Sequence, residues 1–386
     1  MDRARATKGA EEQTVVIGAG PCGMAVARQL RHLHGIDALV FDRAPEPVSS
    51  WRRFHDDFRL NTCAYWSHLP GQHIPSRHGR WPSRDAMVDY FDDYARRQGL
   101  RLRLGAAVER IDRDAAGWRL TVDGESITAA TVVVATGNYH TPRTPSWPGT
   151  QDYTGELLHS VDYHRTGPFV GHDVLVVGSG NSATDIAVRL SDAGARRVRM
   201  SVRTPPHLVP RAIAGVPVDL FSDAFDRLPV AVLDRAAAMM RALWWGDLQE
   251  DGLPAPRKGI YRALLDDTRI PTLGDDLVPR VEDGRIEVVA AVASFDADSV
   301  LLADGTSVRP DVVIAATGYT KGLDDMVGHL GVLDADGDPM SNGTPSAATG
   351  LWFAGYEEPL VGPLRSFRRG ASGLAGAVAG YLKNPA

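Results

Sequence analysis

Two glycine-rich segments have the spacing of a turn that binds a dinucleotide. Residues 18–23 read GAGPCG and residues 178–183 read GSGNSA, and each segment follows a β-branched run and opens a predicted helix. The first glycine of such a turn bends the chain, the second lets the backbone approach a pyrophosphate, and the third lets helix and strand pack closely. The helix N-terminus then presents N–H groups to the phosphates. We expect the contacts to come from Gly18, Gly20 and Gly23 in the first segment, and from Gly178, Ser179, Gly180, Asn181 and Ser182 in the second.

The residue that follows the second strand of each unit differs in charge between the two units. Asp42 lies 24 residues after Gly18, where a carboxylate accepts hydrogen bonds from ribose hydroxyls and repels a 2′-phosphate, which favours FAD or NAD. Arg203 lies 25 residues after Gly178, and a guanidinium pairs with a phosphate in bidentate geometry, which favours NADPH. Three nearby arginines remain alternatives for the phosphate ligand, namely Arg196, Arg197 and Arg199.

Two dinucleotide sites of opposite charge imply hydride transfer from NADPH to FAD. The hypotheses about function then differ in which molecule takes the electrons from the reduced flavin. A disulfide reductase needs a redox-active cysteine pair beside the flavin, but Cys22 and Cys63 form no C-x-x-C motif. A substrate oxidase would not need the NADPH site. Oxygen is the remaining common acceptor. The alternatives are a flavin reductase or electron-transfer protein without oxygenation, and a non-catalytic module that senses NADP.

The two turns lie in strand–helix–strand units about 160 residues apart. The expected strands and helices of these units are 14–17, 22–34 and 38–41, then 174–177, 182–193 and 198–202. Between the units we expect an amphipathic helix and three short strands, at 85–98, 106–111, 118–122 and 131–134. The last of these strands runs into an ATG tripeptide at 135–137, and a similar strand at 312–314 runs into a second ATG at 316–318.

This order predicts an α/β fold with two dinucleotide-binding, Rossmann-like domains. The NADPH domain, residues 151–309, is inserted into a discontinuous FAD domain of residues 1–150 and 310–386. Three prolines between residues 142 and 148 mark the hinge. Residues 205–280 lack strand alternation and contain a helical segment at 231–245, so we expect a helical insertion there. Its methionines and tryptophans have helical spacing, which favours packing over a roof on the substrate entrance.

The composition of the chain indicates which kind of protein it is and which kinds of partner it can bind. The chain has 386 residues, of which 44% are hydrophobic and 23% charged, and its net charge is −6. These values are typical of a globular protein of about two domains, and the absence of a basic block argues against a nucleic-acid partner. Residues 1–12 lack the apolar stretch of a secretory signal, and no run is long enough to span a bilayer. We expect a cytoplasmic protein with a small-molecule substrate, and we recognise no metal cluster.

Several motifs resemble those of the flavin-containing monooxygenase family. Residues 153–163, YTGELLHSVDY, are similar to the F-x-G-x-x-x-H-x-x-x-[YFW] signature of that family, with Tyr153 in place of the first Phe. The resemblance covers almost the whole chain and is nearest to small bacterial and YUCCA-like members. Further similar segments are 50–51, 59–62, 316–319 and 351–356. One departure is at residues 60–63, which read LNTC where those relatives often have a proline-containing motif.

The resemblance implies a mechanism and further site residues. NADPH reduces FAD, and O2 adds to the flavin C4a atom to give a hydroperoxide that oxygenates a small organic substrate at nitrogen or sulfur. The YUCCA-like similarity keeps oxidative decarboxylation of a 2-oxo acid open, and homo-oligomerisation is also left open. Asn61 resembles the asparagine that faces the C4a region, although a turn residue there has an ordinary explanation. The other implied cofactor contacts are Arg43, Trp51, Val108, Gly137, His159, Ser160, Thr204, Gly318 and Tyr319.

Overall fold

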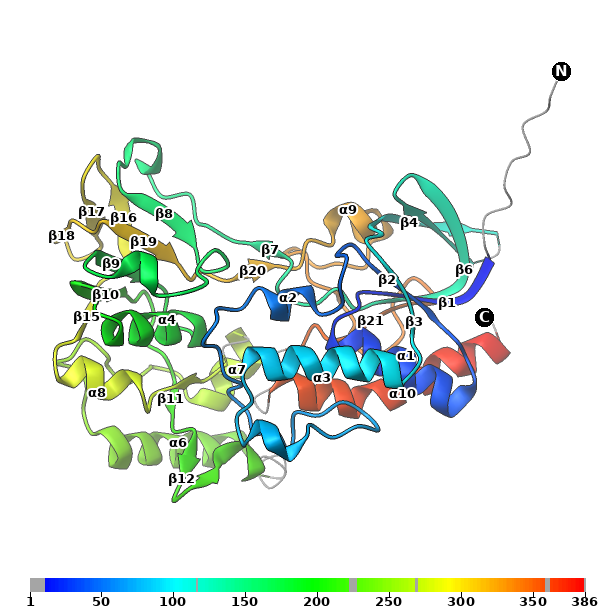
Figure 1. The fold of residues 1–386 in the computed structure, drawn as a ribbon, viewed down its shortest axis with the longest axis horizontal. Coiled ribbons are helices and arrows are strands. Elements are labelled where there is room, and N and C mark those ends of the chain that lie inside the picture. The colour runs from blue at the N-terminus through cyan, green and yellow to red at the C-terminus, as the bar shows by residue number, and fades with distance from the viewer. Residues whose placement is uncertain (1–10, 116, 222–227, 268–269, 358–361, 385–386) are drawn as a thin grey trace.

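Each strand–helix–strand unit builds its own sheet in the computed structural model, which describes residues 11–115, 117–221, 228–267, 270–357 and 362–384 (Figure 1). The two units lie side by side along the long axis, joined by the connections that carry β7 (Thr141–Pro142) and β20 (Tyr319–Thr320). These two short strands pair antiparallel, so the chain leaves the first unit and returns to it at one place.

The first unit has a seven-stranded sheet with the order β3-β2-β1-β6-β5-β4, and β21 also pairs with β6. Strand β1 runs parallel to both β2 and β6, so the first glycine turn emerges between them. Apolar residues of α1, α3 and α10 bury one face of the sheet, and those of α9 pack on the other. The elements are β1 (Glu11–Ile17), α1 (Pro21–His34), β2 (Leu39–Asp42), α2 (Ser49–Arg52), α3 (Arg84–Arg97), β3 (Arg101–Leu104), β4 (Val108–Asp114), β5 (Gly117–Val122), β6 (Glu125–Val134), α9 (Asp324–Val327), β21 (Leu351–Phe353) and α10 (Pro363–Lys383).

The second unit has a five-stranded, all-parallel sheet with the order β15-β10-β9-β19-β8. Helices α4 and α8 cover one face, and a small antiparallel sheet of β16, β17 and β18 covers the other. The elements are β8 (Glu156–His159), β9 (Asp173–Val177), α4 (Asn181–Asp192), β10 (Arg197–Ser201), α8 (Leu277–Glu282), β15 (Ile286–Val289), β16 (Val292–Phe295), β17 (Val300–Leu302), β18 (Ser307–Val308) and β19 (Val312–Ala315).

The α/β class with two dinucleotide-binding units is confirmed, but one predicted boundary is wrong. Because β19 pairs with both β9 and β8, the second sheet extends to Ala315, and the predicted return to the first unit at residue 310 comes too early. Strand β19 and the ATG tripeptide after it repeat the pattern of β6, but β19 lies in the second sheet.

The segment 205–280 is only partly helical. It contains α6 (Val230–Trp245) and α7 (Ile260–Asp267), but also four two-residue strands that pair as β11 with β14 and β12 with β13. These strands are Leu208–Val209, Ala212–Ile213, Val216–Pro217 and Thr272–Leu273. Packing was expected for α6, yet Met239 on this helix is 64% exposed and Leu233 is its one buried residue.

Candidate functional site: two dinucleotide turns and the loop between them

Each glycine turn packs against the ATG tripeptide, here called the ATG box, that follows the neighbouring strand. The first box is residues 135–137 after β6, and the second is residues 316–318 after β19. Gly18 has φ +110° and Gly178 has φ +142°, which are left-handed values that side chains rarely adopt. A methyl group at Gly18 would collide with the carbonyl oxygen of Ala135, and one at Gly178 would collide with that of Ala316. The two units therefore share one construction, in which the carboxyl ends of two adjacent parallel strands open a crevice above the sheet.

The crevice in each unit has open backbone surface on both sides. A Cβ atom built at Gly20 or Gly137 in the first unit, or at Gly180 or Gly318 in the second, would meet no described atom within 4 Å. Gly20 and Gly180 are the N-cap residues of helices α1 and α4, which have no side-chain cap and no acid in the first turn. Each crevice therefore fits a phosphate group, which takes hydrogen bonds from a helix N-terminus. Gly23 instead faces the carbonyl of Gly18, so it serves the packing of α1.

Asp42 lies at the end of β2 beside the first turn. Its Oδ2 accepts a hydrogen bond from the backbone N–H of Ala19 at 2.7 Å, and its Oδ1 accepts one from Ala44 at 2.9 Å. The carboxylate is held in place by the turn and keeps lone pairs for ribose hydroxyls. Arg43 is exposed and donates to the carbonyl of His140 at 3.4 Å. Val108 is buried in the sheet core, so its side chain packs there.

Arg203 is the arginine placed at the second crevice. Ser201, two residues before it, pairs with Val177 next to the glycine turn, and Arg203 is exposed without an ion pair to any residue that the structure describes. In the register of β10 and β9, Arg197 lies opposite Asp173, at the end of the sheet away from the glycine turn. Arg196 is engaged by Asp311 at 2.9 Å, and Arg199 is buried between two carboxylates. The three alternative phosphate ligands therefore either lie at the end of β10 away from the second crevice or already pair with carboxylates.

The polar side chains of the second turn hold neighbouring protein segments. Ser179 Oγ donates to the carbonyl of Thr204 at 2.9 Å. The Asn181 amide donates to the Pro271 carbonyl at 2.9 Å and accepts from the Leu273 N–H at 3.1 Å. These side chains were expected to contact the cofactor, but in the structure they fasten β14 and the chain after β10. Ser182 is exposed at the start of α4, and its role as a cofactor contact stays a prediction.

His159, the histidine of the 153–163 motif, connects β8 to the second ATG box through hydrogen bonds. His159 is 6% exposed, its Nε2–H donates to the Gly318 carbonyl at 3.1 Å, and its Nδ1 accepts from the Val161 N–H at 3.1 Å. Burial lowers the pKa of His159, so the ring is neutral at pH 7. The ring also packs edge-on against Tyr319, and the Ser160 N–H donates to Ala315. This arrangement positions the box and does not carry protons.

The neutral state of His159 makes a prediction about stability. When pH falls below the ordinary histidine pKa of about 6.5, the unfolded chain binds a proton at this position that the folded chain still rejects, so stability falls. We expect His159→Gln to flatten this loss in urea unfolding series between pH 8 and pH 5. At pH 8 the variant should be less stable by about 1 kcal/mol, since it loses a buried hydrogen bond. His32→Gln, on an exposed position of α1, is the matched control; an unchanged pH slope in His159→Gln would contradict the assignment.

Asn61 lies in the loop where the two units and α10 meet. It is half-buried, and its amide makes no hydrogen bond to any described residue. The next residue, Thr62, packs against Gly362 at the start of α10. The N–H of Cys63 donates to Asp219 Oδ2 at 2.8 Å, which fastens residues 211–221 of the second unit over this loop. Trp51 packs edge-on against Phe54, Phe58 and Phe91, so it belongs to an aromatic cluster beside the loop.

A cluster that joins the two units was missed in the sequence. His55 Nε2 is 2.6 Å from Asp185 Oδ2, and Arg189 Nε is 3.0 Å from Asp185 Oδ1. Burial opposes ionisation of Asp185, but His55 and Arg189 together lower its pKa. Tyr163, which closes the signature, is buried against the His55 ring. His55 and Asp185 are 130 residues apart, so no local signal pairs them.

The cysteines are unsuited to disulfide chemistry. Both Cys22 and Cys63 are buried free thiols. Burial raises the pKa of Cys22 to about 12 and that of Cys63 to about 11, so neither forms a thiolate at neutral pH. Among the described residues, no group of His, Cys, Asp and Glu has the arrangement of a metal site, and no helix is long and apolar enough to cross a membrane.

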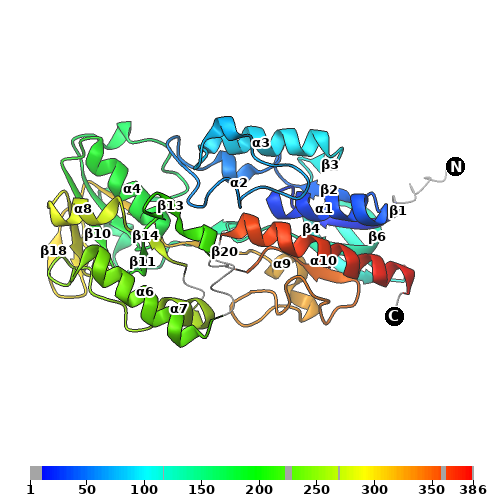
Figure 2. The same ribbon diagram turned by 90° about the horizontal axis from the view of Figure 1, so that it is seen from below.

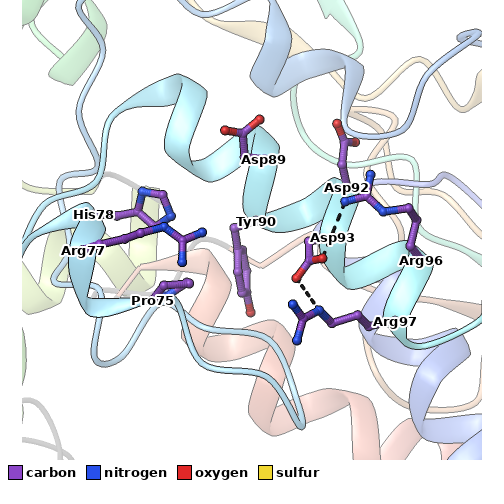
Figure 3. A pocket seen from close by; sticks show the side chains of 9 residues that line it. All are labelled: Pro75, Arg77, His78, Asp89, Tyr90, Asp92, Asp93, Arg96 and Arg97. Carbon is purple, nitrogen blue, oxygen red and sulfur yellow. Dashed lines mark ion pairs between the residues drawn. The ribbon is translucent and has the colours of Figure 1, made fainter.

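Two surface hollows lie away from the crevices. One, of about 250 Å³, lies between α3 and residues 75–78 (Figure 3). Its charges are neutralised locally, because Asp93 pairs with Arg96 and Arg97. The other, of about 740 Å³, lies at the opposite end of β10 and β15 from the glycine turns. The second hollow is lined by Arg196 and Arg197, two of the alternatives for the phosphate ligand, but neither hollow is lined by a residue of the glycine turns, so we place the chemistry in the crevices.

Fold and site together define an oxidoreductase with two dinucleotide sites. Residues 15–211 match the family described as pyridine nucleotide-disulphide oxidoreductase. The chain is 34% identical to the indole-3-pyruvate monooxygenase YUCCA1 of Oryza sativa subsp. japonica, over 83% of this chain and 79% of that protein. The chain belongs to this family, and within it to the flavin monooxygenases, as its motifs predicted.

Solved structures show the same fold. A double mutant of the flavin monooxygenase from Stenotrophomonas maltophilia superposes with a TM-score of 0.76 at 22% identity, covering 96% of this chain and 99% of that one. OTEMO in complex with FAD and NADP superposes with a TM-score of 0.71 at 17% identity, covering 98% and 85%. The protein is an enzyme that uses FAD and NADPH.

Proposed function

We propose that this monooxygenase oxygenates a small organic substrate at nitrogen or sulfur, in the space between the Asn61 loop and the start of α10. The observation that carries the proposal is the pair of open crevices, with the Asp42 carboxylate at one rim and, at the other, the Arg203 guanidinium, which pairs with no carboxylate of the described residues. FAD, when bound, supplies oxygen activation, and NADPH supplies the hydride. The chain's own residues bind, orient and shield these groups.

Each part of the chain has a separate task in this proposal. The first turn and Asp42 hold the FAD pyrophosphate and ribose, and the second turn and Arg203 hold NADPH. The Asn61 amide makes no hydrogen bond to the described residues and would donate one to the oxygen atom being transferred. The contact of Asp219 with Cys63 closes the loop from outside, and the aromatic cluster around Trp51 excludes water from its inner side.

The test of the proposal is substrate-dependent NADPH consumption by the FAD-loaded enzyme. A panel of amines, sulfides and 2-oxo acids is incubated with NADPH and O2, and products are identified by mass. Oxygenated product in proportion to NADPH supports the proposal. Stoichiometric hydrogen peroxide with every compound would show a flavin reductase or oxidase instead.

A second function, oxidative decarboxylation of a 2-oxo acid, is favoured by the likeness to an indole-3-pyruvate monooxygenase. The same panel separates the two functions. A 2-oxo acid substrate would lose CO2 and give an acid one carbon shorter, whereas an amine or sulfide would gain one oxygen atom.

Asn61→Ala should uncouple NADPH oxidation from oxygenation. Removing one donor to a reacting oxygen costs about 10²–10³ in rate in other enzymes, so product per NADPH should fall at least about tenfold and hydrogen peroxide should rise to match. Flavin reduction by NADPH under anaerobic conditions should keep its rate. Asn384→Ala, at the exposed C-terminal end of α10, is the control; unchanged coupling in Asn61→Ala would remove Asn61 from the mechanism.

A further inference from the structure

A short path of contacts connects the first glycine turn to the second. The backbone N–H of Val48 donates to the carbonyl of Ala19 in the first turn at 3.1 Å, and α2 begins at the next residue. His55 follows three residues after the end of α2, and its Nε2 lies 2.6 Å from Asp185 Oδ2 on α4, the helix that follows the second turn. Few residues therefore separate the His55–Asp185 pair from either crevice.

The first part of this path is held in a strained conformation. Val48 is buried and has a left-handed φ of +51°, which a β-branched residue adopts only where the surrounding structure imposes it. Strain of this kind persists at positions whose geometry the fold fixes closely. The position of α2 is therefore tied to that of the first glycine turn.

The second part of the path fastens α4 close to the crevice that it borders. Asp185 lies four residues after Asn181, which is about one helical turn from the start of α4. Its other carboxylate oxygen lies 3.0 Å from Arg189 Nε on the same helix, and Arg189 lies 3.9 Å from Asp57 of the first unit. Both views of the fold show the segment after α2 reaching to α4 (Figure 2). Two side chains of α4 thus contact one short segment of the first unit.

The His55 ring depends on Asp185 for its orientation. The ring is 9% exposed and packs edge-on against Phe58 and Tyr163. Its Nδ1 is buried and makes no hydrogen bond within the described part of the chain, so Asp185 is the one polar partner that the described residues give to this ring. Loss of the carboxylate would leave the ring with aromatic contacts alone.

Other contacts between the units hold different segments. The N–H of Cys63 donates to Asp219, Arg80 donates to the carbonyl of Gly215, and β7 pairs with β20 where the chain crosses between the units. None of these three contacts includes a residue of α4. The position of this helix relative to the first unit is therefore assigned to the segment that carries His55.

We propose that the His55–Asp185 pair aligns the two crevices for the reduction of FAD by NADPH. Units joined by two connections move relative to one another unless specific contacts hold them, and a displacement of about 1 Å between reacting groups costs roughly 100-fold in rate. His55 and Asp185 are positioning residues, because they act through α2 and α4. The inference goes beyond the proposed function, since it concerns the reductive step and not the oxygenated substrate, but it rests on the assignment of one cofactor to each crevice.

The first measurement is the anaerobic reduction of the FAD-loaded enzyme by NADPH, followed by flavin absorbance over a range of NADPH concentrations. His55→Phe keeps a ring against Phe58 and Tyr163 but removes the donor to Asp185. Its reduction rate constant should fall about 10- to 100-fold, while the Kd for NADPH should stay within about threefold of wild type because the second crevice is intact. His55→Gln keeps an N–H donor and should reduce within about threefold of the wild-type rate.

The second measurement does not depend on turnover. Two spin labels are attached through His32→Cys on α1 and Glu282→Cys on α8, which are exposed positions on different units, whereas the native cysteines are buried. Pulsed electron resonance then gives the distance distribution between the labels in the FAD-loaded enzyme without NADPH. The distribution should be broader in His55→Phe than in the labelled parent, and His55→Gln should match the parent.

A double variant tests the pair from both sides. Asp185→Leu should slow reduction as His55→Phe does, and the double variant should be no slower than either single variant, because residues that act as one unit are not additive. The double variant also leaves no buried group without its partner in this pair, so it keeps the test available if a single variant fails to fold.

The matched control is His329→Phe, which removes a histidine–aspartate pair that lies wholly within the first unit. His329 Nε2 is 3.0 Å from Asp112. This variant should keep the reduction rate within about twofold of wild type and leave the label distances unchanged.

Four results would overturn the inference: wild-type reduction in His55→Phe, unchanged label distances in His55→Phe, equal losses in His55→Phe and His55→Gln, or the same loss in His329→Phe. Failure of the proposed function would look different, since no compound of the panel would yield an oxygenated product while reduction of the flavin remained measurable.

Discussion

Gly20→Ala should yield a protein that folds normally and has lost most of its affinity for FAD. Gly20 has φ −78°, which any residue adopts, and an added Cβ would meet no described atom within 4 Å, so the apo fold tolerates the methyl group. The methyl would instead occupy the surface that a pyrophosphate approaches. Overpacking of this kind costs about 1–3 kcal/mol, or roughly 5- to 150-fold in affinity. Flavin absorbance per protein and titration of the apo form measure the loss, and the thermal midpoint of the apo form should not change.

Two companion variants make this result specific. Gly18→Ala should lower the stability of the apo protein itself, because Gly18 has a left-handed φ and a Cβ there would collide with the carbonyl of Ala135. Gly180→Ala should keep FAD and weaken NADPH, since the same open surface lies in the second crevice. Full FAD affinity in Gly20→Ala would show that the first crevice is not the FAD site.

Arg203→Gln should raise the KM for NADPH about 10- to 100-fold, the effect of losing charge-assisted hydrogen bonds of about 1.5–3 kcal/mol. The KM for NADH should change little, because NADH lacks the 2′-phosphate that the guanidinium would bind. Steady-state NADPH and NADH oxidation with one preparation measures both values.

Arg197→Gln is the matched control, because Arg197 is exposed at the far end of β10. It should leave both KM values near those of wild type. Equal effects of Arg203→Gln on NADPH and NADH would contradict a phosphate contact, and a selective effect of Arg197→Gln would move that contact to Arg197.

Local pattern was enough to predict the two glycine turns, their strands and helices, and the opposite charges of Asp42 at the end of β2 and Arg203 after β10. These features depend on residues within about 30 positions of one another, and a glycine with positive φ or a β-branched run acts on its own backbone. The family resemblance was also visible, because its motifs are contiguous. Strand β3 was not predicted, since its sequence RLRL is short and partly exposed.

Contacts between distant segments required the folded chain. The boundary after Ala315 depends on pairing of β19 with β8 and β9, and the use of Asn181 to hold β14 depends on a segment 90 residues later. The same holds for His55 with Asp185. Such pairings are selected by the packing of whole elements, whose geometry no short stretch of sequence encodes. A residue type marks a candidate for chemistry, but its partners, burial and charge state follow from what the fold places around it.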